Sequence, residues 1–118
     1  MTEQAYKGGC QCGKVRYDVT IDLAQTMTCN CSRCGKLGSI LAFTPTKNFT
    51  LRSGERDLTE FQFNKHAIHH VFCSTCGIQS FARGIAPDGV EMVAVNARCL
   101  DDVDVDALTP KKIDGRSF

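Results

Sequence analysis

Seven of the eight cysteines in this 118-residue chain fall into three short clusters, and this spacing limits what the chain can fold around. The clusters are Cys10-x-Cys12, Cys29-x-Cys31-x-x-Cys34 and Cys73-x-x-Cys76. Thiolates grouped this closely typically hold metal, because cysteines in such short runs are poorly placed for structural disulfides. A disulfide framework and an iron–sulfur cluster are the alternatives, but the spacings match neither common ferredoxin run. The pattern therefore predicts zinc.

The total of seven divides naturally into four and three. A closed structural zinc site takes four protein ligands. The first and last clusters flank predicted strands, and nearby glycines permit the positive φ at which backbone amides turn toward sulfur. These glycines are Gly8, Gly9, Gly13 and Gly77. Joined, these clusters would form a four-cysteine cluster consisting of Cys10, Cys12, Cys73 and Cys76. It would close a loop of about 60 residues, so we predict that its zinc is structural.

The middle group is the three-cysteine cluster of Cys29, Cys31 and Cys34. One loop can supply all three ligands, which leaves the fourth position of a zinc ion open to water or substrate, as in catalytic sites. Three thiolates make zinc a weak Lewis acid that is better suited to holding an incoming thiol as thiolate. The sequence therefore predicts two zinc ions per chain, the second supporting sulfur chemistry.

Four further residues bear on this open position. Cys99 is a candidate fourth ligand that would close the second site, although its apolar neighbours favour a buried, inert thiol. His66, His69 and His70 precede Cys73, and each is a candidate ligand or proton carrier, with a purely structural role as the alternative.

The pattern along the chain is that of a compact all-β protein. Residues 14–21 alternate apolar and polar side chains, as in a half-buried strand. Further strands are expected at 40–44, 49–52, 59–63, 68–72, 78–82 and 90–96, most of them bounded by turn residues. Residues 101–108 support at most a short helical turn. Most phenylalanines are expected in the core, with Phe61 and Phe63 on one face. We predict a single domain over residues 5–118.

Charge and hydropathy narrow the class of partner. The formal net charge is +1 and the pI about 7.5, so the chain offers no basic field for a nucleic acid. The expected partner is a small molecule or a protein. No stretch approaches the roughly 20 apolar residues that cross a bilayer, and the N-terminus has no apolar signal region. We therefore predict no membrane association and a cytoplasmic location.

Several motifs in order along the chain carry a family resemblance. They are Gly8-Gly-Cys-Gln-Cys-Gly13, Cys29-Asn-Cys-Ser-Arg-Cys34 with Lys36 and Gly38-Ser39, residues 63–78, Val95-Asn-Ala-Arg-Cys-Leu100 and Asp114-Gly-Arg116. Together they resemble the glutathione-dependent formaldehyde-activating enzyme family, which includes centromere protein V. The resemblance implies a β-tent fold of small packed antiparallel sheets, with the four-cysteine cluster holding a structural zinc and the three-cysteine cluster a second.

The resemblance also implies an activity. It is that of a carbon–sulfur lyase that forms or cleaves S-hydroxymethylglutathione, with a small-molecule thiol such as glutathione as partner and the three-cysteine cluster as catalytic centre. Because glutathione carries two carboxylates, we expect Arg33, Lys36 and Ser39 to bind substrate, with Arg98 as a further candidate. The alternatives are a non-catalytic zinc-stabilised binding module and a lyase that acts on another thiol–aldehyde adduct.

Overall fold

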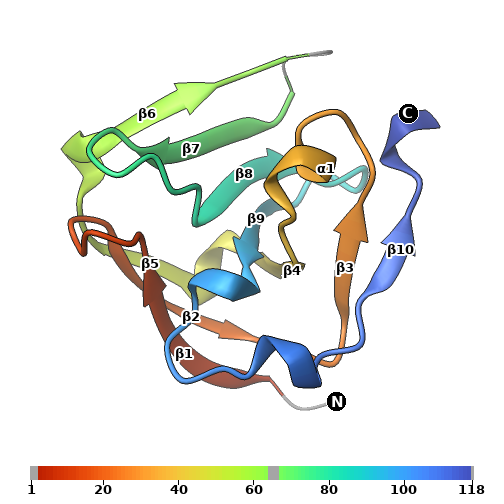
Figure 1. Ribbon diagram of the computed structural model, residues 1–118, viewed down its shortest axis with the longest axis horizontal. Helices are drawn as coiled ribbons and strands as arrows, with labels where there is room; N and C mark the ends of the chain where they lie inside the picture. The colour runs from red at the N-terminus through yellow and green to blue at the C-terminus, as the bar shows by residue number, and fades with distance from the viewer. Residues whose placement is uncertain (1–2, 64–66, 118) are drawn as a thin grey trace.

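The computed structural model describes residues 3–63 and 67–117, and for Arg116 only the backbone. Strands are the main regular structure of this part of the chain (Figure 1). The strands are β1 (Gln4–Gly9), β2 (Arg16–Ile21), β3 (Thr26–Cys29), β4 (Leu41–Pro45), β5 (Phe49–Ser53), β6 (Leu58–Phe61), β7 (His69–Cys73), β8 (Phe81–Ile85), β9 (Glu91–Asn96) and β10 (Lys111–Ile113). The helical segments are α1 (Cys34–Leu37) and the 3₁₀ turns η1 (Thr46–Asn48), η2 (Glu55–Asp57), η3 (Ala97–Cys99), η4 (Val105–Ala107) and η5 (Gly115–Ser117).

The strands of the described residues form two sheets. The small sheet has the antiparallel order β1-β2-β5, and the large sheet has the order β10-β3-β4-β9-β8-β7-β6. All pairs in the large sheet are antiparallel except that of β10 with β3, which is parallel. In Figure 1 the small sheet lies below strands β6, β7 and β8 of the large sheet. The prediction of an all-β fold of small sheets is confirmed, with one parallel edge pair as an addition.

The core lies between the two sheets. Tyr17 of β2 and Phe49 of β5 meet Phe81 of β8, with ring centroids 4.8 to 5.7 Å apart. Because side chains alternate along a strand, Val93 and Val95 of β9 join Phe81 on the same face of the large sheet, and all are buried. The hydroxyl of Tyr17 donates a hydrogen bond to the carbonyl oxygen of Ser80 at 3.1 Å, so the two sheets are also joined by a buried polar contact.

The sequence pattern located all seven of the strands it predicted. They correspond to β2 and to β4 through β9, with ends shifted by a few residues. The largest shift is at β8, which begins at Phe81 because Ile78 belongs to a turn: its carbonyl oxygen accepts a hydrogen bond from Cys73 N at 3.1 Å. The short strands β1, β3 and β10 and the single turn α1 were not predicted. The expected turn within 101–108 is η4.

The phenylalanines only partly follow the prediction. Phe49 and Phe81 are in the core, but Phe43 and Phe61 are 43% and 44% exposed. Phe61 and Phe63 do lie together, with stacked rings 5.9 Å apart. The prediction that most phenylalanines are buried is therefore wrong, because Phe43 projects from the face of the large sheet opposite the core.

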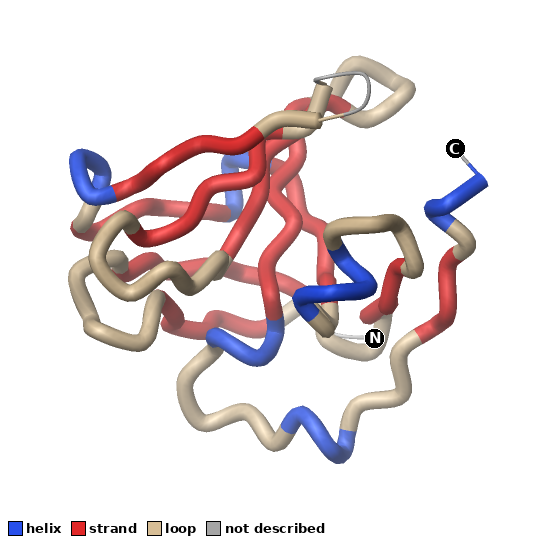
Figure 2. The backbone as a smooth tube through the Cα atoms, turned by 45° about the horizontal axis from the view of Figure 1, so that its top comes forward, coloured by secondary structure: helices blue, strands red, loops and turns tan. Residues whose placement is uncertain are grey.

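The C-terminal segment returns to the side of the molecule that carries the middle cysteine cluster. After η4 it runs along one edge and then pairs β10 with β3, Ile113 lying opposite Cys29 (Figure 2). Asn30 N donates to the carbonyl oxygen of Ile113 at 3.2 Å, and Asn30 Nδ2 donates to Asp114 Oδ1 at 2.9 Å. Residues more than 80 positions apart are thereby joined next to the cysteine loop.

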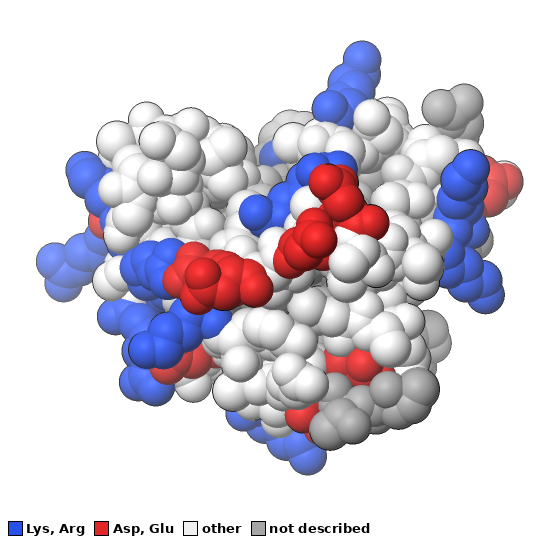
Figure 3. Space-filling view, turned by 60° about the horizontal axis from the view of Figure 1, so that its bottom comes forward, with Lys and Arg blue, Asp and Glu red and all other residues white. Residues whose placement is uncertain are grey.

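Charged side chains of both signs are interspersed on the surface. Figure 3 shows acidic groups next to basic ones on the face that it presents. Ion pairs join Arg16 to Asp101 and Arg52 to Asp18, and such exposed pairs contribute at most about 1 kcal/mol each. In residues 3–63 and 67–117 we find no helix long and apolar enough to cross a membrane.

The hydrogen bond between the sheets gives a stability prediction. Tyr17→Phe keeps the buried ring but leaves the Ser80 carbonyl without this donor, so the free energy of unfolding in urea should fall by about 1 kcal/mol. Tyr6→Phe is the matched control, because its exposed hydroxyl makes only a 3.4 Å contact with Gln4 and its loss should change nothing measurable. Equal unfolding free energies for Tyr17→Phe and the parent protein would contradict the assigned role.

Candidate metal centres

The four-cysteine cluster is assembled by two turns that are far apart in the sequence. Cys10 and Cys12 follow β1, and Cys73 and Cys76 lie at the end of β7 and in the turn after it. Their sulfur atoms all lie within 4.8 Å of one another. The distances Cys10 Sγ to Cys12 Sγ and Cys12 Sγ to Cys73 Sγ are 3.6 and 3.7 Å. A tetrahedron of thiolates around zinc, with bonds of about 2.3 Å, has edges of about 3.8 Å, so the donor set fits the ion.

The backbone of both turns points N–H groups at these sulfur atoms. Val15 N donates to Cys10 Sγ at 3.3 Å, and Thr75 N and Cys76 N donate to Cys73 Sγ at 3.4 and 3.5 Å. Such donors favour the thiolate form that a metal requires. In the same turn the backbone N–H of Ile78 lowers the pKa of Cys76 to about 6.

The glycines around the four-cysteine cluster serve two different purposes. Gly13 and Gly77 have φ angles of +84° and +80°, as the sequence predicted for residues that close these turns. Gly8 and Gly9 instead lie in β1 without positive φ, so for them the expected left-handed backbone is wrong. These positions require glycine because a side chain would not fit. A methyl group on Gly8 would approach the Cys99 carbonyl oxygen to 2.8 Å.

The three-cysteine cluster is built locally, as the sequence predicted. Cys29 ends β3, Cys34 begins α1, and Cys31 lies in the loop between them. All three are half-buried, and their sulfur atoms lie within 4.8 Å of one another. Cys31 N donates to Cys29 Sγ at 3.5 Å, and Cys34 N donates to Cys31 Sγ at 3.3 Å. This set of soft donors with amide support fits zinc as the four-cysteine cluster does.

The electrostatics of the three-cysteine cluster favour a cation. Burial raises the pKa of Cys34 to about 12, and the neighbouring sulfur of Cys31 adds to the shift. Three adjacent thiols cannot all ionise without a positive charge between them. A divalent metal supplies that charge and displaces the protons.

The C-terminus packs directly on the three-cysteine cluster. A methyl group built on Gly115 would overlap the sulfur atom of Cys29. Since Asp114 is held by Asn30 in the cysteine loop, the segment that carries Gly115 is placed by contacts of that loop itself. Sequence reasoning gave the motif Asp114-Gly-Arg116 no role, and nothing local in the sequence signals that it reaches this site.

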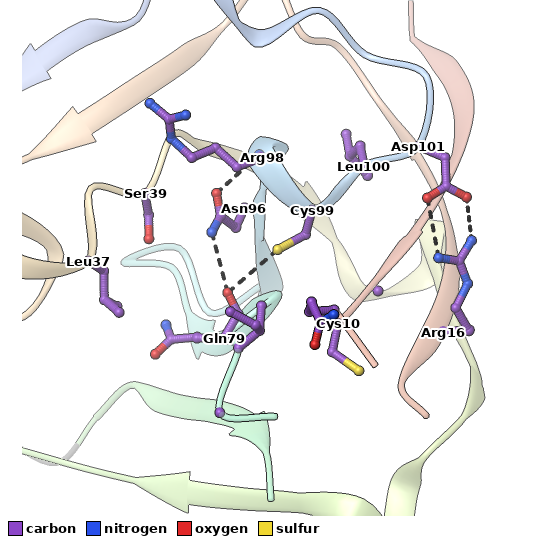
Figure 4. A pocket seen from close by; sticks show the side chains of 14 residues that line it. Cys10, Arg16, Leu37, Ser39, Gln79, Asn96, Arg98, Cys99, Leu100 and Asp101 are labelled. Carbon is purple, nitrogen blue, oxygen red and sulfur yellow. Dashed lines mark hydrogen bonds and ion pairs between the residues drawn. The ribbon is translucent and has the colours of Figure 1, made fainter. Parts of the chain in front are cut away.

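Cys99 joins neither cluster. Its thiol donates a weak hydrogen bond to the carbonyl oxygen of Gln79, with sulfur and oxygen 3.9 Å apart (Figure 4). Burial raises the pKa of Cys99 to about 11, and the nearby sulfur of Cys10 adds to the shift. Among the described residues no fourth Cys, His, Asp or Glu completes the three-cysteine cluster. The expected burial is only partial, because Cys99 is half-buried, and its inertness stays a prediction.

The histidines separate into different environments. His69 is exposed and its Nδ1 lies 2.7 Å from Glu60 Oε2. His70 is buried, stacks on Phe63 with centroids 5.1 Å apart, and lines the same cavity as the three-cysteine cluster. His66 lies outside the described residues. Of the two described candidates, only His70 lines the cavity that also holds the three-cysteine cluster.

Gln79 connects the two metal centres and was not identified from the sequence. It follows Cys76 by three residues, and its Oε1 accepts hydrogen bonds from Arg33 Nε and Nη2 at 3.0 and 2.7 Å. Because an arginine only donates, Gln79 Nε2 is the atom that faces His70 Nδ1, at 3.4 Å. A glutamine in a strand-like segment carries no sequence signal for such a position.

The three residues expected to bind substrate have different surroundings. Ser39 is buried and lines the cavity beside the three-cysteine cluster. Lys36 is exposed on α1. The guanidinium of Arg33 is bound to Gln79 and lies 4.8 Å over the ring of Phe61. Arg98 donates to the Gly38 carbonyl oxygen at 3.1 Å and borders a second cavity, which holds Cys10 and Cys99 (Figure 4).

The cavity at the three-cysteine cluster has a volume of about 630 Å³. The wall of the cavity includes the three cysteines of the cluster together with Ser39, His70 and Gln79. A metal on this cluster would therefore border a cavity, partly open to solvent, of the size that binds organic ligands. The arrangement can hold a thiol against a metal and leave room for a second reactant.

Metal content tests the division between the two clusters. We expect close to two zinc ions per chain by elemental analysis. Cys31→Ser should lose about one and remain folded, because the loop is not needed to join the sheets. Cys12→Ser should lose the structural zinc and unfold or aggregate the domain, as seen by circular dichroism. Unfolding of Cys31→Ser would show instead that both centres are structural.

Gly115 offers a more selective test. The added methyl of Gly115→Ala must displace Cys29, so zinc affinity of the three-cysteine cluster, measured by competition with a chromophoric chelator, should fall about 10- to 100-fold. Gly35→Ala is the control from the same loop, because its added methyl meets its nearest neighbour at 3.7 Å. Unchanged affinity in Gly115→Ala would show that the C-terminal segment does not support this site.

Comparisons with known proteins agree with this architecture. The profile of the family described as glutathione-dependent formaldehyde-activating enzyme matches residues 5–114. A solved crystal structure of a Rhodobacter sphaeroides protein, a structural genomics target, is 30% identical in sequence and superimposes with a TM-score of 0.81. That match covers 91% of this chain and 99% of the other. The chain belongs to the glutathione-dependent formaldehyde-activating enzyme family.

Proposed function

We propose that this protein is a zinc-dependent carbon–sulfur lyase that forms or cleaves the adduct of a thiol, such as glutathione, with an aldehyde. The observation that carries the proposal is the three-cysteine cluster at the wall of a cavity of about 630 Å³, without a fourth protein ligand among the described residues. Family membership supports it. When bound there, zinc supplies an open coordination position that favours the thiolate form of an incoming thiol.

His70 is the proposed proton carrier. Burial lowers the pKa of His70, and the positive charge of Arg33 adds to the shift, so the ring is neutral near pH 7. Since Gln79 Nε2 donates to Nδ1, the hydrogen of the neutral ring is on Nε2. In this tautomer His70 donates a hydrogen bond to the aldehyde oxygen as negative charge develops there. Phe63 and Gln79 hold the ring in place.

The remaining candidates receive narrower roles. Ser39, buried in the cavity wall, is proposed to contact substrate. Lys36 is exposed and follows Cys34 by two residues. We assign it as the partner of a carboxylate group on the thiol substrate. Arg33 is proposed to position Gln79 and hence His70, because its guanidinium is already engaged.

The activity is tested by the exchange rate between free thiol, aldehyde and hemithioacetal, measured by NMR. The zinc-loaded protein should accelerate exchange above the spontaneous rate at equal thiol concentration. Cys31→Ser should abolish the acceleration, and His70→Gln should reduce it about 100-fold or more.

His69→Gln is the matched control, because the imidazole of His69 is exposed and contacts Glu60 outside the cavity. It should leave the rate unchanged. A rate with the parent protein that equals the spontaneous rate for every thiol and aldehyde would reject the lyase and favour a non-catalytic binding module.

A further inference from the structure

The face of the large sheet opposite the core is hollowed by small residues. Phe43 of β4 lies opposite Ala94 of β9. Ala94 also lies opposite Ala82 of β8, on its other side. Ala82 lies opposite His70 of β7. Residues opposite one another in an antiparallel sheet project from the same face, so these four form one row across four strands. In the next row Met92 lies opposite Gly84. Small side chains thus form the floor of the cavity.

Large apolar side chains surround this floor. Phe43 and Ile68, both in the cavity wall, are 43% and 51% exposed. Apolar groups left in water around a hollow are typical of a site for an apolar ligand. They meet the three-cysteine cluster in the same wall, so a ligand on this floor would also reach the metal centre.

Charge is nearly absent from the wall of this cavity. Among the described residues that line it, Arg83 is the one member of the group Lys, Arg, Asp and Glu. Its guanidinium lies 5.3 Å over the rings of Phe49 and Phe81, which belong to the core on the opposite face of the sheet. A carboxylate would find no cationic partner on the floor, whereas an alkyl chain or a ring would be desolvated at no electrostatic cost.

The volume also exceeds what a one-carbon aldehyde needs. Formaldehyde is little larger than a water molecule, which occupies about 30 Å³ in the liquid. Placed beside the sulfur of a bound thiol, it would leave the floor of Ala82, Gly84 and Ala94 in contact with water. Each buried CH₂ group of a longer chain should strengthen binding about fourfold by displacing that water.

Resting on the lyase function proposed above, we propose that the carbonyl substrate of this protein is an aldehyde with an apolar chain or ring of several carbons. In the forward reaction the thiol sulfur bonds to the carbonyl carbon and the C=O double bond becomes a C–OH single bond. The sulfur atom loses its proton and the new hydroxyl oxygen gains one. The addition therefore needs no oxidant or reductant. The apolar substituent lies on the floor formed by Ala82, Gly84 and Ala94.

Two stable thioethers of equal charge test this proposal. S-hexylglutathione represents the adduct of an apolar aldehyde and S-methylglutathione that of formaldehyde. Titration calorimetry with the zinc-loaded protein should show the hexyl compound binding at least about tenfold more tightly. Ala94→Leu, which fills the floor, should remove this preference while retaining both zinc ions and binding of the methyl compound.

Thr50→Leu is the control, because it adds the same side chain at an exposed position of β5 outside the cavity. It should preserve the preference. Equal affinity of the two thioethers for the parent protein would overturn the apolar substrate, even if thiol–aldehyde exchange is accelerated. A hexyl preference without accelerated exchange would instead reject the lyase and leave the apolar ligand site in place.

Discussion

The convergence of four thiols on one point is the constraint on which the rest of the structure depends. Cys10 and Cys12 belong to the turn after β1, and Cys73 and Cys76 to the turn after β7, so the cluster ties the small sheet to the large one. Only a metal can hold four thiolates this close, because their mutual repulsion would otherwise separate them or keep them protonated. A metal bound at this cluster would therefore be coupled to folding.

This constraint extends to the second metal centre through Gln79. The turn that carries Cys76 continues into Gln79, whose side chain contacts Arg33 in the middle loop and His70 in β7. The C-terminal segment supports the same loop from the other side through Gly115. The three-cysteine cluster is thus local in sequence, but its orientation toward the cavity depends on residues from both distant ends of the large sheet.

The two faces of the large sheet serve different purposes. One face carries Phe81, Val93 and Val95 into the core and stabilises the domain. The other presents alanine, glycine and exposed apolar residues around a cavity. Because side chains alternate along each strand, the same strands β8 and β9 build both the core and the proposed substrate site. A change of one residue in register would exchange the two faces.

Cysteine spacing and side-chain alternation predicted, from the sequence alone, the two clusters and the seven strands that the structure contains. The three-cysteine cluster and the strands are properties of neighbouring residues, so the sequence alone could predict them. The pairing of Cys10 and Cys12 with Cys73 and Cys76 was inferred instead from the similar form of the two runs and from the four ligands that a closed zinc site takes. The tertiary structure decided that Cys99 stays apart and that His70 rather than His69 lines the cavity of the three-cysteine cluster. It decided as well that Gln79 contacts Arg33 and His70 and that Gly115 packs on Cys29. It also decided that Phe43 faces a cavity. Each of these depends on contacts between strands distant in sequence, and a periodic pattern shows that a strand has two faces without showing what covers them.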